Sequence, residues 1–307
     1  MANATTTRSI LADERQVTVP SPKLPVYNRQ RFLLAFIQQL DKSISARDLQ
    51  KLVFMYSMKK SADHYDFVPY KYGAYSFQLA QDVEVLKLQG HLIPSSERIE
   101  SVCHGKSLQV DARFVDEQRG NSLVRKAYTA YPYYAINSTI ADRLLDQSAM
   151  DAVKATKQRL QKSEQRLFSI GYEGMSIEYF LNVLLGRNVR LLCDVRQNPL
   201  SRKFGFSKKM LQHVTEQVGI KYVHVPELGI EPQKRQSLET PEDYKALFAE
   251  YEKTLPSREA ALQQVYSLFR TYSRIALMCY ERDPDFCHRT LVKNSLISTY
   301  QMESEEI

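Results

Sequence analysis

The chain has 307 residues, enough for two domains of ordinary size, and its 43% hydrophobic and 25% charged residues are typical of a globular protein. No apolar run approaches the roughly 20 residues that span a bilayer, so no membrane partner is expected. The net charge of +7 permits a polyanionic partner such as nucleic acid, although many cytosolic proteins carry a similar charge and bind none.

The N-terminal sequence MANATTTRSILADERQ lacks the apolar segment of a signal peptide, so we expect a cytoplasmic protein. The four cysteines are few and unevenly spaced, which argues against a disulfide framework and agrees with that location. Residues 1–26 are polar, with several prolines near their end, and we interpret them as a flexible tail.

A mainly helical domain is predicted over residues 27–120, because apolar residues recur there at steps of three and four. The predicted helices cover residues 29–40, 45–58 and 77–88, and the predicted short strands cover residues 92–93 and 107–115. This order favours a winged-helix-like domain. Ser45 is expected to cap the second helix and Gly90 to close the third. The residues of the third helix expected to face inward are Leu79, Val83, Leu86 and Leu88.

Three segments of this domain, KLVFMYSM, YDFVPYKYGAYSFQLAQDVEVL and QGHLI, resemble the SocA-like or Panacea domains. The resemblance covers roughly residues 30–95, and Ala74 stands where that pattern usually has proline. It implies a protein-interaction or antitoxin-like module that binds a partner without catalysis. Residues 121–166 contain further helix, which we interpret as a connector, although membership of the N-terminal domain explains them equally well.

From residue 167 to residue 307, short apolar runs alternate with amphipathic helices. The runs are LFSIGYEG, VRLLCDVR, IKYVHVPELG and RIALMCYE, and the helix patterns between them carry capping residues at Ser176, Ser207 and Thr240. Such alternation predicts a parallel sheet covered on both faces, in a Rossmann-like α/β domain. Ligands of such sheets bind in a crevice beyond the carboxyl ends of the strands.

Polar side chains stand at the predicted carboxyl ends of all four strands. They are Tyr172, Glu173, Asp194, Arg196, His224, Glu227, Cys279 and Glu281, followed closely by Cys287, His288 and Arg289. The blocks SIGYEGMSIEYFLNVLL, LLCDVRQNPLSRKFGFSKKML, GIKYVHVPELG and IALMCYERDPDFCHRTLV resemble the domain-of-unknown-function 488 family over roughly residues 167–300. That resemblance implies a Rossmann-like fold in a bacterial or archaeal cell, and it implies no reaction.

A catalytic cysteine is one interpretation of this edge. Cys287 stands beside His288 and Arg289 at a predicted helix start, where its pKa should be lowered. The DVR segment and the strand that ends in Cys279 are similar to rhodanese-like sulfur-transfer domains. The signature of a phosphatase loop is absent, because its cysteine and arginine are closer together in sequence than Cys279 and Arg289, which are ten positions apart. Equally, Cys287 could pack under the helix while Arg289 pairs with an acid.

Asp194 and Glu281 form a candidate acid–base pair, with a structural ion-pair network as the alternative. The predicted catalytic residues are therefore Asp194, Glu281, Cys287 and His288. A zinc site from Cys279, Cys287 and His288 with His224 or Glu281 has suitable ligand types but lacks any C-x-x-C pair. We predict neither a metal nor a cofactor.

Residues 187–209 include seven cationic residues and one acid, Asp194. Phe204 and Phe206 lie among the cationic residues in the sequence. This pattern suits phosphate contact and base stacking, although a solvated face is the commoner outcome for a run of charge. The predicted ligand-binding residues are Tyr172, Glu173, Arg196, Ser201, Arg202, Cys279 and Arg289. We expect this edge to bind a phosphate-bearing ligand, nucleic acid or a nucleotide, with catalysis left open. The alternatives are a non-enzymatic regulator and cysteine-dependent sulfur transfer.

Overall fold

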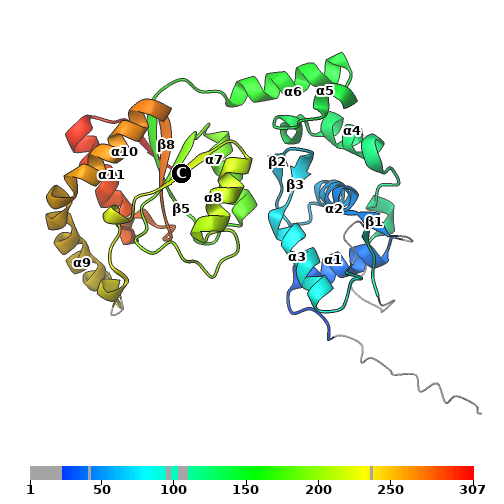
Figure 1. Ribbon diagram of the computed structural model, residues 1–307, viewed down its shortest axis with the longest axis horizontal. Helices are drawn as coiled ribbons and strands as arrows, with labels where there is room; N and C mark the ends of the chain where they lie inside the picture. Colours follow the sequence, from blue (N-terminus) through cyan, green and yellow to red (C-terminus); the bar gives the residue numbers. More distant parts are fainter. Residues whose placement is uncertain (1–22, 41–42, 95–97, 103–109, 236–237) are drawn as a thin grey trace, which may run out of the picture.

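The computed structural model describes residues 23–40, 43–94, 98–102, 110–235 and 238–307 (Figure 1). Most of the predicted tail therefore lies outside the described residues, as does Cys103. Within the described ranges, each helix is too short or too polar to cross a membrane.

The N-terminal region is built on three helices, α1 (Asn28–Gln38), α2 (Ala46–Lys60) and α3 (Phe77–Leu88). The Ser45 side chain accepts a hydrogen bond from the Asp48 amide and caps α2 as predicted. Gly90 adopts a positive φ of 76° just beyond α3, which confirms it as the residue that closes that helix. The inward orientation predicted for Leu88 is wrong, because this residue is 88% exposed. It lies two positions from buried Leu86, which turns it to the opposite side of the helix.

Short strands join these helices in an arrangement that differs from the predicted wing. Strand β1 (Ile44–Ser45) pairs antiparallel with β4 (Arg98–Ile99), and Leu92 forms an isolated bridge with Ser101. Part of the second predicted strand, Ala112–Phe114, is instead a turn of 3₁₀ helix, and residues 107–109 lie outside the described ranges. An unpredicted hairpin of β2 (Val68–Tyr70) and β3 (Gly73–Tyr75) lies between α2 and α3.

Four further helical segments follow: α4 (Gly120–Ala130), η2 (Pro132–Ala135), α5 (Ala141–Leu144) and α6 (Gln147–Leu160). Helix α4 contributes to two apolar clusters. Leu123 and Ala127 pack into the core of α1, α2 and α3, whereas Val124 and Tyr128 pack with Val153 of α6. This segment is therefore anchored to the N-terminal helices through α4.

The C-terminal region contains a five-stranded parallel sheet in the order β7-β6-β8-β5-β9, which confirms the predicted parallel α/β architecture. Its strands are β5 (Arg166–Gly171), β6 (Leu191–Asp194), β7 (Lys221–His224), β8 (Arg274–Cys279) and β9 (Ser304–Glu306). Every residue of the central strand β8 is buried, as expected for a strand covered on both faces. Strand β9 was not predicted, because its sequence SEE carries no apolar signal.

Helices cover both faces of this sheet (Figure 1). Helices α7 (Ile177–Gly186) and α8 (Lys208–Gln217) pack on one face, and α9 (Pro241–Thr254), α10 (Glu259–Tyr272) and α11 (Arg289–Tyr300) pack on the other. The predicted caps at Ser176 and Thr240 are confirmed, the latter as a capping box with Asp243. Ser207 does precede α8 but forms no side-chain cap, because its hydroxyl bonds to the backbone of Ser201.

Candidate functional site at the carboxyl edge of the sheet

The parallel register brings the predicted site residues to one edge of the sheet. Gly171, at the end of β5, pairs with Cys279, and Asp194, at the end of β6, pairs with His224. The backbones approach closely here, because a Cβ atom on Gly171 would overlap the carbonyl oxygen of Glu281. The strand ends and the segment after β8 are therefore packed backbone to backbone, and we call this packed backbone the frame of the edge. It requires glycine at position 171.

Asp194 and Arg196 form a buried ion pair within this frame. The Arg196 guanidinium donates to both carboxylate oxygens, Nε to Oδ1 at 2.8 Å and Nη2 to Oδ2 at 2.6 Å. Its Nη1 donates to the Tyr172 hydroxyl at 2.8 Å, and the Tyr222 hydroxyl donates to Asp194 at 2.7 Å. The two charged side chains are 0% and 6% exposed, so each has its partners inside the protein. This pairing supports the structural alternative for Asp194.

Two histidines hold the backbone that follows β6. His224 bonds through Nε2 to the carbonyl oxygen of Arg196 at 2.8 Å, and His288 bonds through Nε2 to that of Val195 at 3.1 Å. A carbonyl oxygen only accepts, so Nε2 carries the proton in both rings. Nδ1 is then an acceptor in each neutral ring. In His224 it faces the Lys208 ammonium at 3.1 Å.

Arg289 is also fully buried, at the first position of α11. Its guanidinium donates to the Ser169 hydroxyl at 3.0 Å, the Glu306 carboxylate at 2.7 Å and the carbonyl oxygens of Glu281 and Arg282. The acid that it pairs with is thus on β9, the strand that the sequence did not reveal. These bonds tie β5, β9 and the segment after β8 together, which leaves Arg289 no exposed surface for a ligand.

Cys279 and Cys287 are both buried, with 2% and 1% of their surface exposed. The Cys279 Sγ atom lies 3.1 Å from Glu281 Oε2 and 3.6 Å from His288 Nδ1. The pKa of Cys287 is raised well above its usual value, first by burial and then by the neighbouring Cys279 thiol. The lowered pKa predicted for Cys287 is therefore wrong. Helix α11 begins two residues later, at Arg289, and burial in the protein interior raises the pKa of a thiol.

The exposed part of the edge follows β6. Residues 197–209 (QNPLSRKFGFSKK) contain four cations and no acid. Arg202, Lys208 and Lys209 are exposed, and Ser201 and Lys203 are half-buried. On the β5 side, exposed Glu173 accepts a hydrogen bond from the Arg282 amide at 3.1 Å. The predicted stacking role of Phe206 is not supported, because this ring is 0% exposed and stacks on Tyr172 with centroids 4.1 Å apart.

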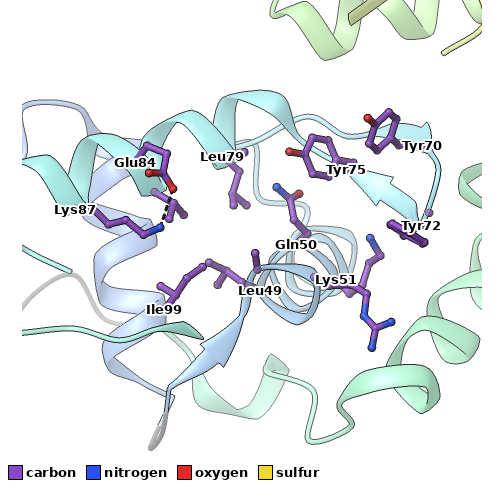
Figure 2. A pocket seen from close by; sticks show the side chains of 15 residues that line it. Leu49, Gln50, Lys51, Tyr70, Tyr72, Tyr75, Leu79, Glu84, Lys87 and Ile99 are labelled. Carbon is purple, nitrogen blue, oxygen red and sulfur yellow. Dashed lines mark hydrogen bonds and ion pairs between the residues drawn. The ribbon is translucent and has the colours of Figure 1, made fainter. Parts of the chain in front are cut away.

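The N-terminal region contains a cavity of about 300 Å³ that no sequence pattern indicated (Figure 2). Helix α2 contributes Leu49, Gln50 and Lys51 to its wall, and the β2–β3 hairpin contributes three tyrosines, Tyr70, Tyr72 and Tyr75 (Figure 2). The remaining polar lining includes Arg47 and the ion pair of Glu84 with Lys87, at 2.8 Å. The cavity therefore combines aromatic walls with a net excess of cations.

Lys51 is the unusual group in this cavity, because its side chain is 1% exposed. Its Nζ donates to the carbonyl oxygen of Ala74 at 2.7 Å. Burial, with repulsion from Arg47, lowers the pKa of Lys51 to about 7. No pattern along the sequence indicates this, because Lys51 lies outside the apolar stripe of α2 and its partner, the carbonyl oxygen of Ala74, belongs to the β2–β3 hairpin, more than 20 residues further along the chain.

One comparison with known proteins gives a match, and it covers part of the C-terminal region. No curated protein and no solved structure matches the chain. Residues 176–296, from the N-cap of α7 into α11, match the model of the family described as Domain of unknown function DUF488.

Proposed function

We propose that the carboxyl edge of the sheet binds a phosphate-bearing ligand, nucleic acid or a nucleotide, through the segment of residues 197–209. The observation that carries this proposal is the four cations of that segment, which itself contains no acid and follows the end of β6. Cationic side chains on an exposed surface contact phosphates without large desolvation. The sequence suggested Arg196 and Arg289 as ligand contacts. Arg196 would instead hold the start of the loop that presents these cations, and Arg289 would hold the neighbouring segment after β8.

The N-terminus of α8 adds to this proposal. Lys208 is its first residue, and Ser207 at the N-cap position bonds to Ser201 and not to the helix amides. The partial positive charge of a helix N-terminus therefore lies within the same basic segment. The Lys208 ammonium is held against His224, at the end of β7, by its 3.1 Å contact with Nδ1.

The test is a binding titration of labelled single- and double-stranded DNA and RNA at several salt concentrations, with Arg202→Ala/Lys208→Ala beside the wild type. Because each lost phosphate contact removes about one unit from the slope of log K against log salt, the variant should bind more weakly with a slope lower by about two. Nucleotides are titrated in the same way.

The matched control is Arg190→Ala/Lys221→Ala, which removes two exposed cations from the opposite edge of the sheet, where β6 and β7 begin. Equal losses in both double variants would mean that binding follows net charge alone. Absence of binding by the wild type at low salt would reject the proposal outright.

A second candidate function is favoured by the cavity in the N-terminal region, which suits a small aromatic or aliphatic ligand with an acidic group beside Lys51. With the resemblance to SocA-like or Panacea domains, this supports a non-enzymatic regulator whose N-terminal, winged-helix-like domain binds a partner. A set of aromatic carboxylates screened by ligand-detected NMR tests it. Such a ligand should bind Lys51→Met more weakly than the wild type, and equal affinities would exclude the cavity.

We further propose that the C-terminal region is Rossmann-like and that the protein acts in nucleic-acid metabolism or bacterial defence. Cysteine-dependent sulfur transfer is disfavoured by the burial of both thiols at the edge. Mass spectrometry of the native protein discriminates here, because a sulfur carrier would show a persulfide on Cys279 or Cys287.

A further inference from the structure

Three potential metal ligands meet inside the frame of the carboxyl edge. The ligand atoms of Cys279, Cys287 and His288 all lie within 4.8 Å of one another, and each of the three residues is buried. Cys279 ends β8, whereas Cys287 and His288 immediately precede α11. The end of β8 and the start of α11 thus hold the two thiols and the imidazole in position.

The distances suit a tetrahedral ion. Bonds of about 2.3 Å to sulfur and about 2.0–2.1 Å to nitrogen place the two ligand atoms about 3.6 Å apart at a tetrahedral zinc ion. Cys279 Sγ and His288 Nδ1 are 3.6 Å apart. Glu281 Oε2 lies 3.1 Å from the same sulfur, so a small movement of this half-buried side chain makes it a fourth ligand.

The outer contacts of His288 are those of a metal-ligating histidine. Its Nε2 is committed to the carbonyl oxygen of Val195 at 3.1 Å, which leaves the Nδ1 lone pair directed toward the thiols. Histidines that bind metals through one ring nitrogen commonly donate the other N–H to a backbone carbonyl, which fixes both tautomer and ring orientation. Here that carbonyl belongs to the loop after β6, so the site connects three elements of the edge.

We propose that Cys279, Cys287 and His288 bind a thiophilic divalent cation, Zn²⁺, with Glu281 in the fourth position. The ion replaces the thiol protons, so that up to two protons leave the protein for each Zn²⁺ that binds. Two thiolates, one imidazole and one carboxylate fill all four positions around a tetrahedral ion with protein ligands, as in structural zinc sites. Bound there, the ion joins the end of β8 to the start of α11 and to the β6 loop.

The experiment uses the full-length chain, purified under a phosphine reductant, and Co²⁺ as a spectroscopic probe. One equivalent of Co²⁺ should give thiolate-to-metal charge-transfer absorption and the ligand-field bands of a tetrahedral ion, and Zn²⁺ should displace it. Cys287→Ala should lower Zn²⁺ affinity, measured by competition with a chromophoric chelator, by more than about 100-fold, because losing even an outer partner costs 10–100-fold.

Cys193→Ala is the matched control, because Cys193 is an equally buried thiol of β6 that lies outside the cluster. It should bind Co²⁺ like the wild type.

If Cys287→Ala does not fold, the wild-type protein alone still tests the proposal. Zn²⁺ should protect two thiols from a thiol reagent and raise the melting temperature. Absence of the cobalt absorption, with thiols equally reactive with and without Zn²⁺, would overturn the proposal. Phosphate binding at residues 197–209 is measured in a separate titration, so a negative result there leaves the Zn²⁺ proposal standing, and the reverse also holds.

Discussion

At the scale of single residues, burial decides what each polar group at the strand ends can do. Asp194, Arg196 and Arg289 are residue types found in active sites, but all three are buried and saturated with internal hydrogen bonds. Removing one member of such a pair leaves an uncompensated buried charge, which costs about 3–5 kcal/mol. Loss of function in an Asp194 or Arg196 variant would therefore reflect a destabilised fold and would not show that the residue takes part in a reaction. The exposed Arg202 and Lys208 are better probes.

Lys51 provides a prediction at the same scale. Its pKa in the folded protein, about 7, lies below the ordinary value of 10.5, so the unfolded chain binds the additional proton between these values. Burial of the amine therefore destabilises the fold fully below pH 7, and the penalty disappears as the pH rises toward 10.5. Lys51→Met should be more stable than the wild type at pH 6, on the order of a few kcal/mol, by urea denaturation.

This advantage should shrink between pH 7 and pH 10.5, and at the upper limit the loss of the bond to Ala74 should leave the variant about 1 kcal/mol less stable. Lys157→Met, which changes an exposed lysine of α6, should show no such dependence on pH. A constant difference between wild type and Lys51→Met across this range would mean that Lys51 is charged in the folded protein.

At the scale of elements, the close approach at the end of β5 sets the geometry of the carboxyl edge. Gly171 pairs with Cys279 in the β5–β8 ladder, and a side chain there would overlap the backbone of Glu281. Gly171→Ala should therefore destabilise the protein by about 3 kcal/mol or more, the upper range for overpacking, because backbone must move. Thermal unfolding monitored by circular dichroism measures this.

Gly186→Ala is the comparison, because a Cβ there meets nothing within 4 Å and Gly186 lies at the end of helix α7. Alanine is the better helix former, so this variant should be neutral or more stable by up to about 1 kcal/mol. Similar melting temperatures for the two variants would show that the strand end tolerates a side chain and that the backbones of Gly171 and Glu281 can move apart.

At the scale of the whole molecule, the two regions bond to each other at the starts of α3 and α7. Glu178, in the first turn of α7, accepts hydrogen bonds from the Ser76 hydroxyl at 3.1 Å and the Gln78 amide at 2.8 Å, at the start of α3. In return, Asp66 of the N-terminal region accepts from the hydroxyl of Ser176, the N-cap of α7, at 2.6 Å. Apolar packing continues across the contact, because Phe77 shares a buried cluster with the sheet region.

Glu178 should make this contact sensitive to pH. Burial raises its pKa from 4.5 to about 7. The folded state then binds the additional proton, so the stability that Glu178 contributes is complete below pH 4.5 and is lost as the pH rises through 7. Glu178→Gln imitates the protonated carboxyl. It should be more stable than the wild type at pH 8, on the order of a few kcal/mol, with little difference at pH 4.5 by urea denaturation.

Glu242→Gln is the control, since Glu242 occupies the same second helical position in α9 but is exposed. It should leave the pH profile of the wild type unchanged. If Glu178→Gln and wild type followed parallel profiles from pH 4.5 to 8, the carboxylate would be charged throughout and the contact between the regions would not respond to pH.

The sequence by itself determined the features that local chemistry controls. Periodic apolar residues predicted the parallel α/β sheet, and Ser45, Ser176 and Thr240 predicted helix starts, because caps and periodicity act within a few residues. It also placed Cys279, His288 and their neighbours at one edge, since parallel strands end together.

Only the tertiary structure decided which of these groups are accessible. Strand β9 carries no apolar pattern, yet it supplies the carboxylate of Glu306 that pairs with Arg289. The β2–β3 hairpin buries Lys51, and the contact between the regions buries Glu178. Burial arises from packing between residues far apart in the chain, and it changes pKa values and exposure without leaving a local pattern in the sequence.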